Sequence, residues 1–193
     1  MERLLKIFFC FSAICFTTCG PSAEYVRYSR SADSLSGAVN AATIQLQSVD
    51  TLLIKKAITR YTYYFAFIEH TISDTLQKEE ADQLLRFMSS GKHLQEFEHN
   101  RHLLFARGKL IGTQLSHLAE DARQQRTQPD VLKAYYKTES SEADKLLQFC
   151  HQQLSLCQTA LSDFKSSLGA VETLIRQRNK GELPQVVLDS ITF

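Results

Sequence analysis

The feature that most constrains the fold of this chain is a stripe of apolar residues between positions 143 and 175. Its members recur at alternating steps of four and three residues, a spacing that places all of them on one side of an α-helix. At 1.5 Å per residue, the stripe predicts a helix about 50 Å long. The members are Ala143, Leu147, Cys150, Leu154, Cys157, Leu161, Phe164, Leu168, Val171 and Ile175.

A second stripe with the same spacing occupies the middle of the chain, and only Arg101 and Gly108 depart from its apolar character. Glycine costs about 1 kcal/mol of helix propensity, so we expect Gly108 to let a neighbouring helix approach closely. Arg101 is expected to extend its guanidinium to the surface or to pair with a carboxylate of another helix. The members are Leu94, Phe97, Arg101, Leu104, Gly108, Ile111, Leu115, Leu118 and Ala122.

The first helical region is expected to begin near Ala32 or Asp33, and its apolar stripe slips in phase at Ile54. Such a slip indicates a helix that rotates its buried side or contacts two partners. A shorter helix is predicted over residues 77–90, with Gly91 as its C-terminal cap.

Short connections make consecutive helices antiparallel neighbours, and no strand pattern precedes the tail at residues 181–193. Pro129 suits the first position of the last helix. The sequence therefore predicts an all-α fold: an antiparallel helical bundle of three long helices plus one short helix, with heptad-patterned seams, over residues 32–180.

The N-terminus has the pattern of an export signal. Arg3 and Lys6 precede an apolar run over residues 7–16, which ends at Thr17-Thr18-Cys19-Gly20. A positive start and a short apolar run are typical of a secretory signal, and the run is too short to span a bilayer as a mature anchor. Residues 1–18 are therefore predicted to be a signal peptide.

The stretch Phe16-Thr17-Thr18-Cys19 resembles the lipobox of bacterial lipoproteins, from which it differs at Phe16 and Thr18. The resemblance implies that Cys19 becomes the first mature residue, carries lipid on its sulfur and nitrogen, and anchors the protein to a membrane of the cell envelope. Residues 19–31 would then form a tether. Simple cleavage and an uncleaved signal anchor are the alternatives, and the choice between inner and outer membrane stays open.

Residues 60–68 carry aromatic side chains on nearly every side of the predicted helix. A single seam cannot bury them all, because Tyr63, Tyr64 and Phe67 fall away from the apolar stripe. One interpretation is a central helix covered on both sides. The other is a binding surface, either an aromatic-lined pocket or a partner interface. Its candidate residues are Tyr61, Tyr63, Tyr64, Phe65 and Phe67.

Cys150 and Cys157 lie about 10 Å apart along one helix, which is too far for a disulfide between them. We expect two buried side chains that behave as small apolar groups; pairing of one cysteine across a homodimer seam is the alternative. Glu96, His99 and His102 are expected on the solvated side of their helix, so no metal site is predicted.

The sequence predicts a role in binding or scaffolding and no enzymatic activity. It contains no catalytic motif and no cofactor motif, so no catalytic residues are proposed. Lys and Arg number 22 against 21 Asp and Glu, whereas a nucleic-acid-binding protein carries a basic surplus. We expect a lipid-anchored envelope protein with a protein partner or a second copy of itself. The alternatives are a secreted soluble helical protein without lipid, and an envelope chaperone or carrier with an aromatic-lined apolar cavity.

Overall fold

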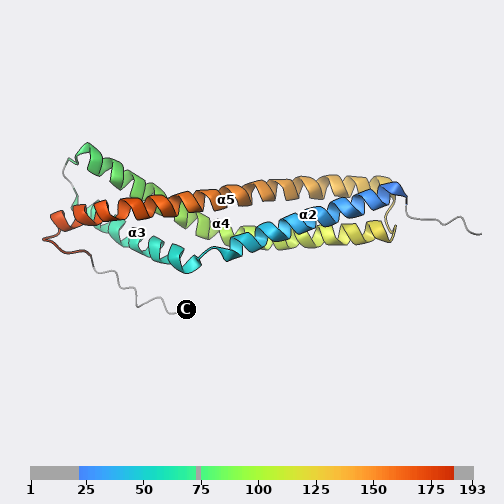
Figure 1. Cartoon of the computed structure of the whole chain (residues 1–193), viewed down its shortest axis with the longest axis horizontal. Coiled ribbons are helices and arrows are strands. Elements are labelled where there is room, and N and C mark those ends of the chain that lie inside the picture. Colours follow the sequence, from blue (N-terminus) through green and yellow to red (C-terminus); the bar gives the residue numbers. More distant parts are fainter. Residues whose placement is uncertain (1–21, 73–74, 185–193) are drawn as a thin grey trace, which may run out of the picture.

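A computed structural model of the chain describes residues 22–72 and 75–184. The described residues form four helices and no strand: α2 (Ala23–Ser48), α3 (Thr51–Thr71), α4 (Lys78–Arg123) and α5 (Pro129–Arg178). They pack as an elongated bundle (Figure 1), which confirms the predicted all-α fold. The predicted signal peptide, Cys19 and residues 185–193 lie outside the described part.

Helices α4 and α5 run the length of the bundle and support the rest of it (Figure 1). They contain 46 and 50 residues, so each is about 70 to 75 Å long at 1.5 Å per residue. Phe87 faces Phe164, with ring centroids 5.0 Å apart, and Arg107 pairs with Glu142. These two contacts join α4 and α5 at separate levels of the bundle.

Helices α2 and α3 lie one after the other along this pair, with a break at residues 49–50 (Figure 1). Asp50 has an extended backbone, and its carboxylate accepts a 2.9 Å hydrogen bond from the backbone N–H of Leu53. This N-cap starts a new helix. The phase slip at Ile54 therefore reflects a second helix with its own buried side, and the prediction of one continuous first helix was wrong.

The predicted short helix over residues 77–90 is the first part of α4, which continues through Gly91 without interruption. Gly91 is buried, and a Cβ atom at this position would overlap the ring of Tyr61. Its function is to admit an aromatic ring, not to end a helix. The prediction of three long helices and one short helix was therefore wrong in its divisions.

Helix α2 begins at Ala23, earlier than the predicted start near Ala32. Tyr28 is 5% exposed and packs on Tyr136 of α5, with ring centroids 5.3 Å apart. The Tyr25 hydroxyl donates a 2.8 Å hydrogen bond to the backbone carbonyl of Thr127. Part of the segment predicted as a tether therefore belongs to the bundle, because its tyrosines have a helical surface to cover.

Small residues bring α2 and α4 close together. A Cβ atom at Gly108 would lie 2.5 Å from Thr43 Oγ1, and one at Gly112 would lie 2.9 Å from Asn40 Oδ1. Ser36 Oγ donates a 3.0 Å hydrogen bond to the Gly112 carbonyl. The expected close approach at Gly108 is confirmed.

The apolar stripe of α5 lies at the centre of the bundle, between α4 and the α2–α3 line. The four leucines of the stripe are half-buried, and its six other members are buried. A second buried row runs beside the stripe because α5 contacts helices on two flanks; it consists of Leu146, Gln153, Ala160, Ser167 and Leu174. Among the described helices, none is long and apolar enough to cross a membrane.

Candidate functional site

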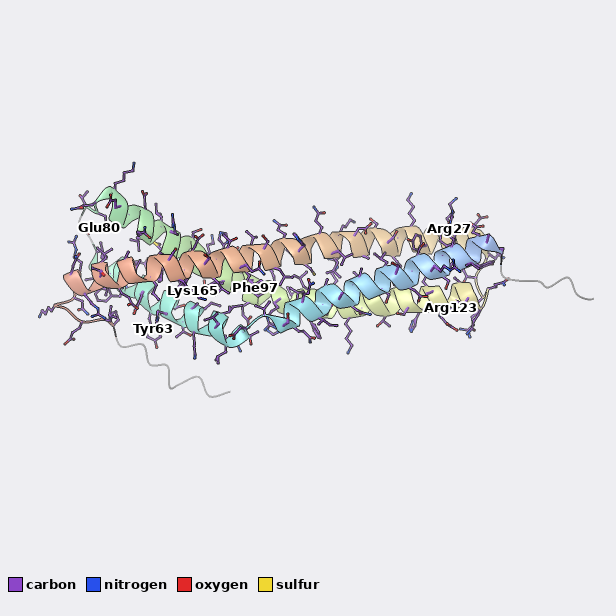
Figure 2. The ribbon with its side chains drawn as sticks, in the orientation of Figure 1. Arg27, Tyr63, Glu80, Phe97, Arg123 and Lys165 are labelled. Atoms are coloured by element: carbon purple, nitrogen blue, oxygen red, sulfur yellow. The ribbon has the colours of Figure 1, made fainter. Side chains whose placement is uncertain are left out.

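The end of the bundle formed by α3, the start of α4 and the end of α5 holds the aromatic residues singled out in the sequence. Figure 2 shows Tyr63 and Glu80 at this end, and Arg27 and Arg123 at the opposite end. We call the first the distal end and the second, where α2 begins, the proximal end.

Tyr64 is the most deeply buried residue of the aromatic segment, with 2% of its surface exposed. The expectation that it would fall away from the buried stripe was wrong. Helix α3 starts afresh at Thr51, so its buried side follows Ile54, Ala57, Tyr64 and Ile68. The buried side of α3 thus includes Tyr64 among its aromatic residues.

Phe87 of α4 is fully buried and gathers the aromatic rings of three helices. Its ring centroid lies 5.9 Å from that of Tyr61, 6.2 Å from that of Tyr64 and 5.0 Å from that of Phe164. Tyr61 also contacts Phe65 at 5.7 Å. These separations fall within the range in which aromatic pairs attract one another. The distal end is therefore held by an aromatic cluster made of these five residues.

The five candidate surface residues do not share one environment. Tyr64 is buried, while Tyr61, Phe65 and Phe67 are half-buried, and Tyr63 is 39% exposed. Leu52 of the same helix is 62% exposed. The outward side of α3 thus offers Tyr63 to solvent, and most of the remaining aromatic surface lies against other rings or the core.

Beside the aromatic cluster, Tyr64 makes a polar contact with α5. Tyr64 Oη donates a 3.0 Å hydrogen bond to Glu172 Oε1, and Arg60 Nη1 lies 4.0 Å from the same oxygen. Burial, followed by the bond to Glu172 and its negative charge, raises the pKa of Tyr64 to about 12. Burial also raises the pKa of Tyr61. The Tyr64 hydroxyl is therefore a permanent donor at neutral pH and does not act as a base.

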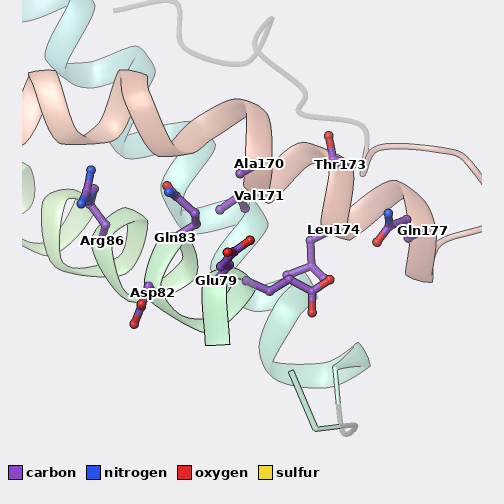
Figure 3. A pocket seen from close by; sticks show the side chains of 10 residues that line it. Glu79, Asp82, Gln83, Arg86, Ala170, Val171, Thr173, Leu174 and Gln177 are labelled. Atoms are coloured by element: carbon purple, nitrogen blue, oxygen red, sulfur yellow. The ribbon is translucent and has the colours of Figure 1, made fainter. Parts of the chain in front are cut away.

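A cleft of about 520 Å³ opens at the distal end between the first turns of α4 and the last turns of α5 (Figure 3). Its α4 wall is polar and mostly acidic. Its α5 wall includes Ala170, Val171 and Leu174, and no lining residue is aromatic. The α4 residues are Glu79, Glu80, Asp82, Gln83 and Arg86.

The α4 wall of this cleft offers hydrogen-bond acceptors. Gln83 Oε1 is buried and accepts no hydrogen bond from the described residues, and an unpaired buried acceptor is costly. Glu80 Oε2 accepts a 3.0 Å hydrogen bond from the Gln77 backbone N–H and so completes the capping box of α4. The α4 wall can accept N–H donors and positive charge. On the α5 wall, Ala170, Val171 and Leu174 can contact a hydrocarbon group, beside the polar Thr173 and Gln177.

Sequence reasoning did not identify this cleft. Acidic residues in a first helical turn are favoured by the helix dipole, so Glu79 and Glu80 gave no signal of binding. The facing residues near Val171 belong to an ordinary apolar stripe. Only the packing of α4 on α5 brings the two sets together.

The remaining candidates are not part of a shared site. Glu96, His99 and His102 are exposed, as predicted. Arg101 pairs with Glu98 of its own helix at 3.1 Å, not with a carboxylate of another helix. Within residues 22–72 and 75–184, no group of three or more His, Cys, Asp or Glu side chains is arranged to hold a metal ion.

Cys150 and Cys157 are free thiols with 2% of their surface exposed, which confirms the expected burial. Burial raises the pKa of Cys157 to about 11, with a smaller contribution from the charge of Glu98. Burial raises the pKa of Cys150 as well. Both thiols are thus protonated and inaccessible in the folded chain, which does not fit pairing across a dimer seam.

Comparisons with known protein families, with curated proteins and with solved structures found no match to this chain.

Proposed function

We propose that the protein is an exported, lipid-anchored helical bundle of a bacterial cell envelope that acts by binding or scaffolding. In this proposal Cys19 carries the lipid, and antiparallel helices with heptad-patterned seams form a rod that holds a binding end away from the membrane. The expected partner is a protein, either another envelope component or a second copy of this chain.

The separation of the two ends of the bundle is the observation that supports this role. Only Gly20, Pro21 and Ser22 lie between Cys19 and the start of α2 at Ala23. The cleft lies at the first turns of α4, about 70 Å from the other end of that helix at 1.5 Å per residue. The exposed Tyr63 lies on α3 in the same half of the bundle (Figure 2). A lipid at Cys19 would thus hold the proximal end at the bilayer and present the distal end to a partner.

The distal end favours a protein partner over an apolar ligand. Its aromatic rings fill the space between one another, and the cleft beside them has a polar wall with no aromatic lining. A lysine or arginine side chain of a partner matches this wall, because its hydrocarbon stem and its N–H donors fit the two sides. A carrier for apolar molecules would need an enclosed apolar cavity.

The anchor is tested by the intact mass of the N-terminal peptide from the full chain expressed in a Gram-negative host, beside Cys19→Ala. We expect a diacylglyceryl and an acyl group on Cys19 of the wild type and neither in the variant. A mature chain that starts beyond Cys19, or an intact Met1, would refute the anchor and favour the secreted or signal-anchored alternatives.

The binding end is tested by site-specific photocrosslinking in the same host. A crosslinking residue at Tyr63 is compared with one at Ile44, which is 63% exposed on α2 away from the distal end. We expect a defined product at position 63 that weakens when Asp82→Lys reverses a charge in the cleft. Its mass distinguishes a second copy from another protein. Equal products at both positions would contradict a distal binding end.

A further inference from the structure

Two adjoining hollows follow the line where α2 meets α5 at the proximal end of the bundle. Their volumes are about 340 Å³ and about 450 Å³, and they share Ser31, Tyr136 and Ser140 as lining residues. They therefore form one groove, and the two helices contribute its opposite sides.

Positive side chains line this groove from both helices. Arg27 and Arg30 come from α2, and Lys133 and Lys137 come from α5. Asp144 is the one carboxylate among the lining residues of the two hollows. The groove therefore has a local excess of positive charge in a chain whose Lys and Arg residues, 22 in all, nearly balance its 21 Asp and Glu residues.

Among the described residues, the two lysines of the groove lack the carboxylate partners that other cations of the bundle have. Arg107 and Lys145 both pair with Glu142, and Arg123 pairs with Asp33. By contrast, in the described part of the chain, neither Lys133 nor Lys137 is within ion-pair distance of a carboxylate. An anion that entered the groove would therefore not have to displace an internal partner.

Arg27 is held in place by an aromatic side chain. Its Nη2 donates a 3.1 Å hydrogen bond to the Tyr28 hydroxyl, and its guanidinium carbon lies 4.8 Å from the centre of the Tyr28 ring. Tyr28 is itself fixed by its packing on Tyr136. A guanidinium has five N–H donors, so this contact leaves donors for a ligand.

We propose that the groove binds phosphate groups. Arginine and lysine are the side chains that proteins use to bind phosphate oxygens, and the hydroxyl of Ser31 adds a donor between the two helices. The phosphate can belong to an anionic lipid headgroup or to a small soluble molecule.

The lipid source rests on the proposed anchor at Cys19. Three residues separate Cys19 from Ala23, and an extended chain spans at most about 3.6 Å per residue. An anchored chain would therefore hold the groove at the membrane surface, where headgroup phosphates are concentrated. A soluble phosphate would need no anchor.

The test uses the full chain, purified in neutral detergent, with two probes followed by chemical shifts of backbone amides. One probe is inorganic phosphate, and the other is the same micelle doped with phosphatidylglycerol, with phosphatidylcholine as the reference. Lys133→Gln/Lys137→Gln removes two exposed groove cations. Lys92→Gln/Lys165→Gln removes the same charge from exposed positions outside the groove and is the matched control.

We expect saturable shifts at α2 and α5 residues of the groove, weakened about tenfold or more in the groove variant and less than twofold in the control. A response to phosphatidylglycerol alone identifies a lipid headgroup, and an equal response to inorganic phosphate identifies a soluble source. No response to either probe, or equal weakening in both variants, would overturn the proposal. An unmodified Cys19 with intact phosphate binding would refute the anchor and leave the groove in place.

Discussion

The half of the bundle that contains α2 and the half that contains α3 both pack against α4 and α5, but the first does so through small residues and the second through large aromatic rings. Along α2, the small residues Gly108 and Gly112 of α4 let the two helices approach, and Ser36 Oγ of α2 donates a hydrogen bond to the Gly112 carbonyl. Along α3, large rings fill the space, and only Gly91 makes room for one of them. Both halves pack on the same two long helices, α4 and α5. Whether α4 presents small residues or aromatic rings therefore depends on whether α2 or α3 lies against it.

The difference teaches that a glycine within a long helix has no single meaning. Gly91 and Gly108 are both buried in α4, yet one receives an aromatic ring and the other a threonine hydroxyl. The small-residue half depends on close backbone approach over several turns, whereas the aromatic half depends on one ring cluster. Substitutions in each half should therefore have separable effects.

The largest expected effect is that of Phe87→Ala, which removes the ring at the centre of the aromatic cluster. Loss of a fully buried phenylalanine costs about 3 to 5 kcal/mol of unfolding free energy, measured by urea denaturation. Leu115→Ala, also fully buried, is the counterpart and should cost about 2 to 5 kcal/mol. Hydrogen exchange should show the greater loss of protection in α3 for Phe87→Ala. Uniform loss along the rod in both variants would show that the halves are not separable.

Gly91→Ala should cost about 1 to 3 kcal/mol, because its Cβ would overlap the Tyr61 ring and force that side chain to move. Gly169→Ala on α5 is the matched control. No atom lies within 4 Å of its Cβ position, so this change should stabilise the helix by about 0.5 to 1 kcal/mol. Thermal unfolding of the two variants measures these changes in stability. An unchanged stability of Gly91→Ala would mean that the Tyr61 ring has room to shift.

Ser36→Ala tests the small-residue half and should cost about 1 kcal/mol. The change removes the bond to the Gly112 carbonyl and the 3.0 Å contact with Ser116 Oγ. Ser166→Ala is the control, since its hydroxyl bonds only to the Asp163 carbonyl on an exposed side of α5. Denaturation of both variants measures the difference, and equal effects would remove any special role of the α2–α4 contact.

The smallest effect is expected from the ionisation of Tyr64. Its folded pKa of about 12 lies above the ordinary value of 10.0, so the folded state favours the neutral phenol. The resulting stability is fully present below about pH 10 and is lost as pH rises towards 12. Unfolding free energies at increasing alkaline pH should fall less steeply in Tyr64→Phe than in the wild type. Tyr63→Phe removes a hydroxyl from an exposed position of the same helix and is the matched control.

The parts of the fold that depend on local periodicity were predictable. The stripes at residues 94–122 and 143–175 identified the bodies of α4 and α5, and Pro129 marks the start of α5 as expected. Sequence periodicity works here because each helix keeps one side buried over many turns. The break at Asp50 was not recognised, although an N-cap aspartate is a local signal for a helix start.

The parts that depend on neighbouring helices were not predictable. Gly91 has the sequence character of a helix cap, and only the nearby Tyr61 ring explains why it lies within a helix. Tyr64 was assigned to the wrong side because the helices packed against α3 decide which of its sides is buried. The distal cleft and the proximal groove each combine residues from helices far apart in sequence, so no local pattern reports them.

The sequence by itself determined that this chain is helical, that helices α4 and α5 are long, and part of the set of residues that they bury. These properties follow from the period of the apolar residues, which is local. The tertiary structure decided where the first helix divides, which aromatic side chain is buried and which charges share a surface. Those outcomes depend on which helices meet and at what level along the rod. The reason is that burial of a side chain and proximity of charges are set by contacts between segments distant in the chain.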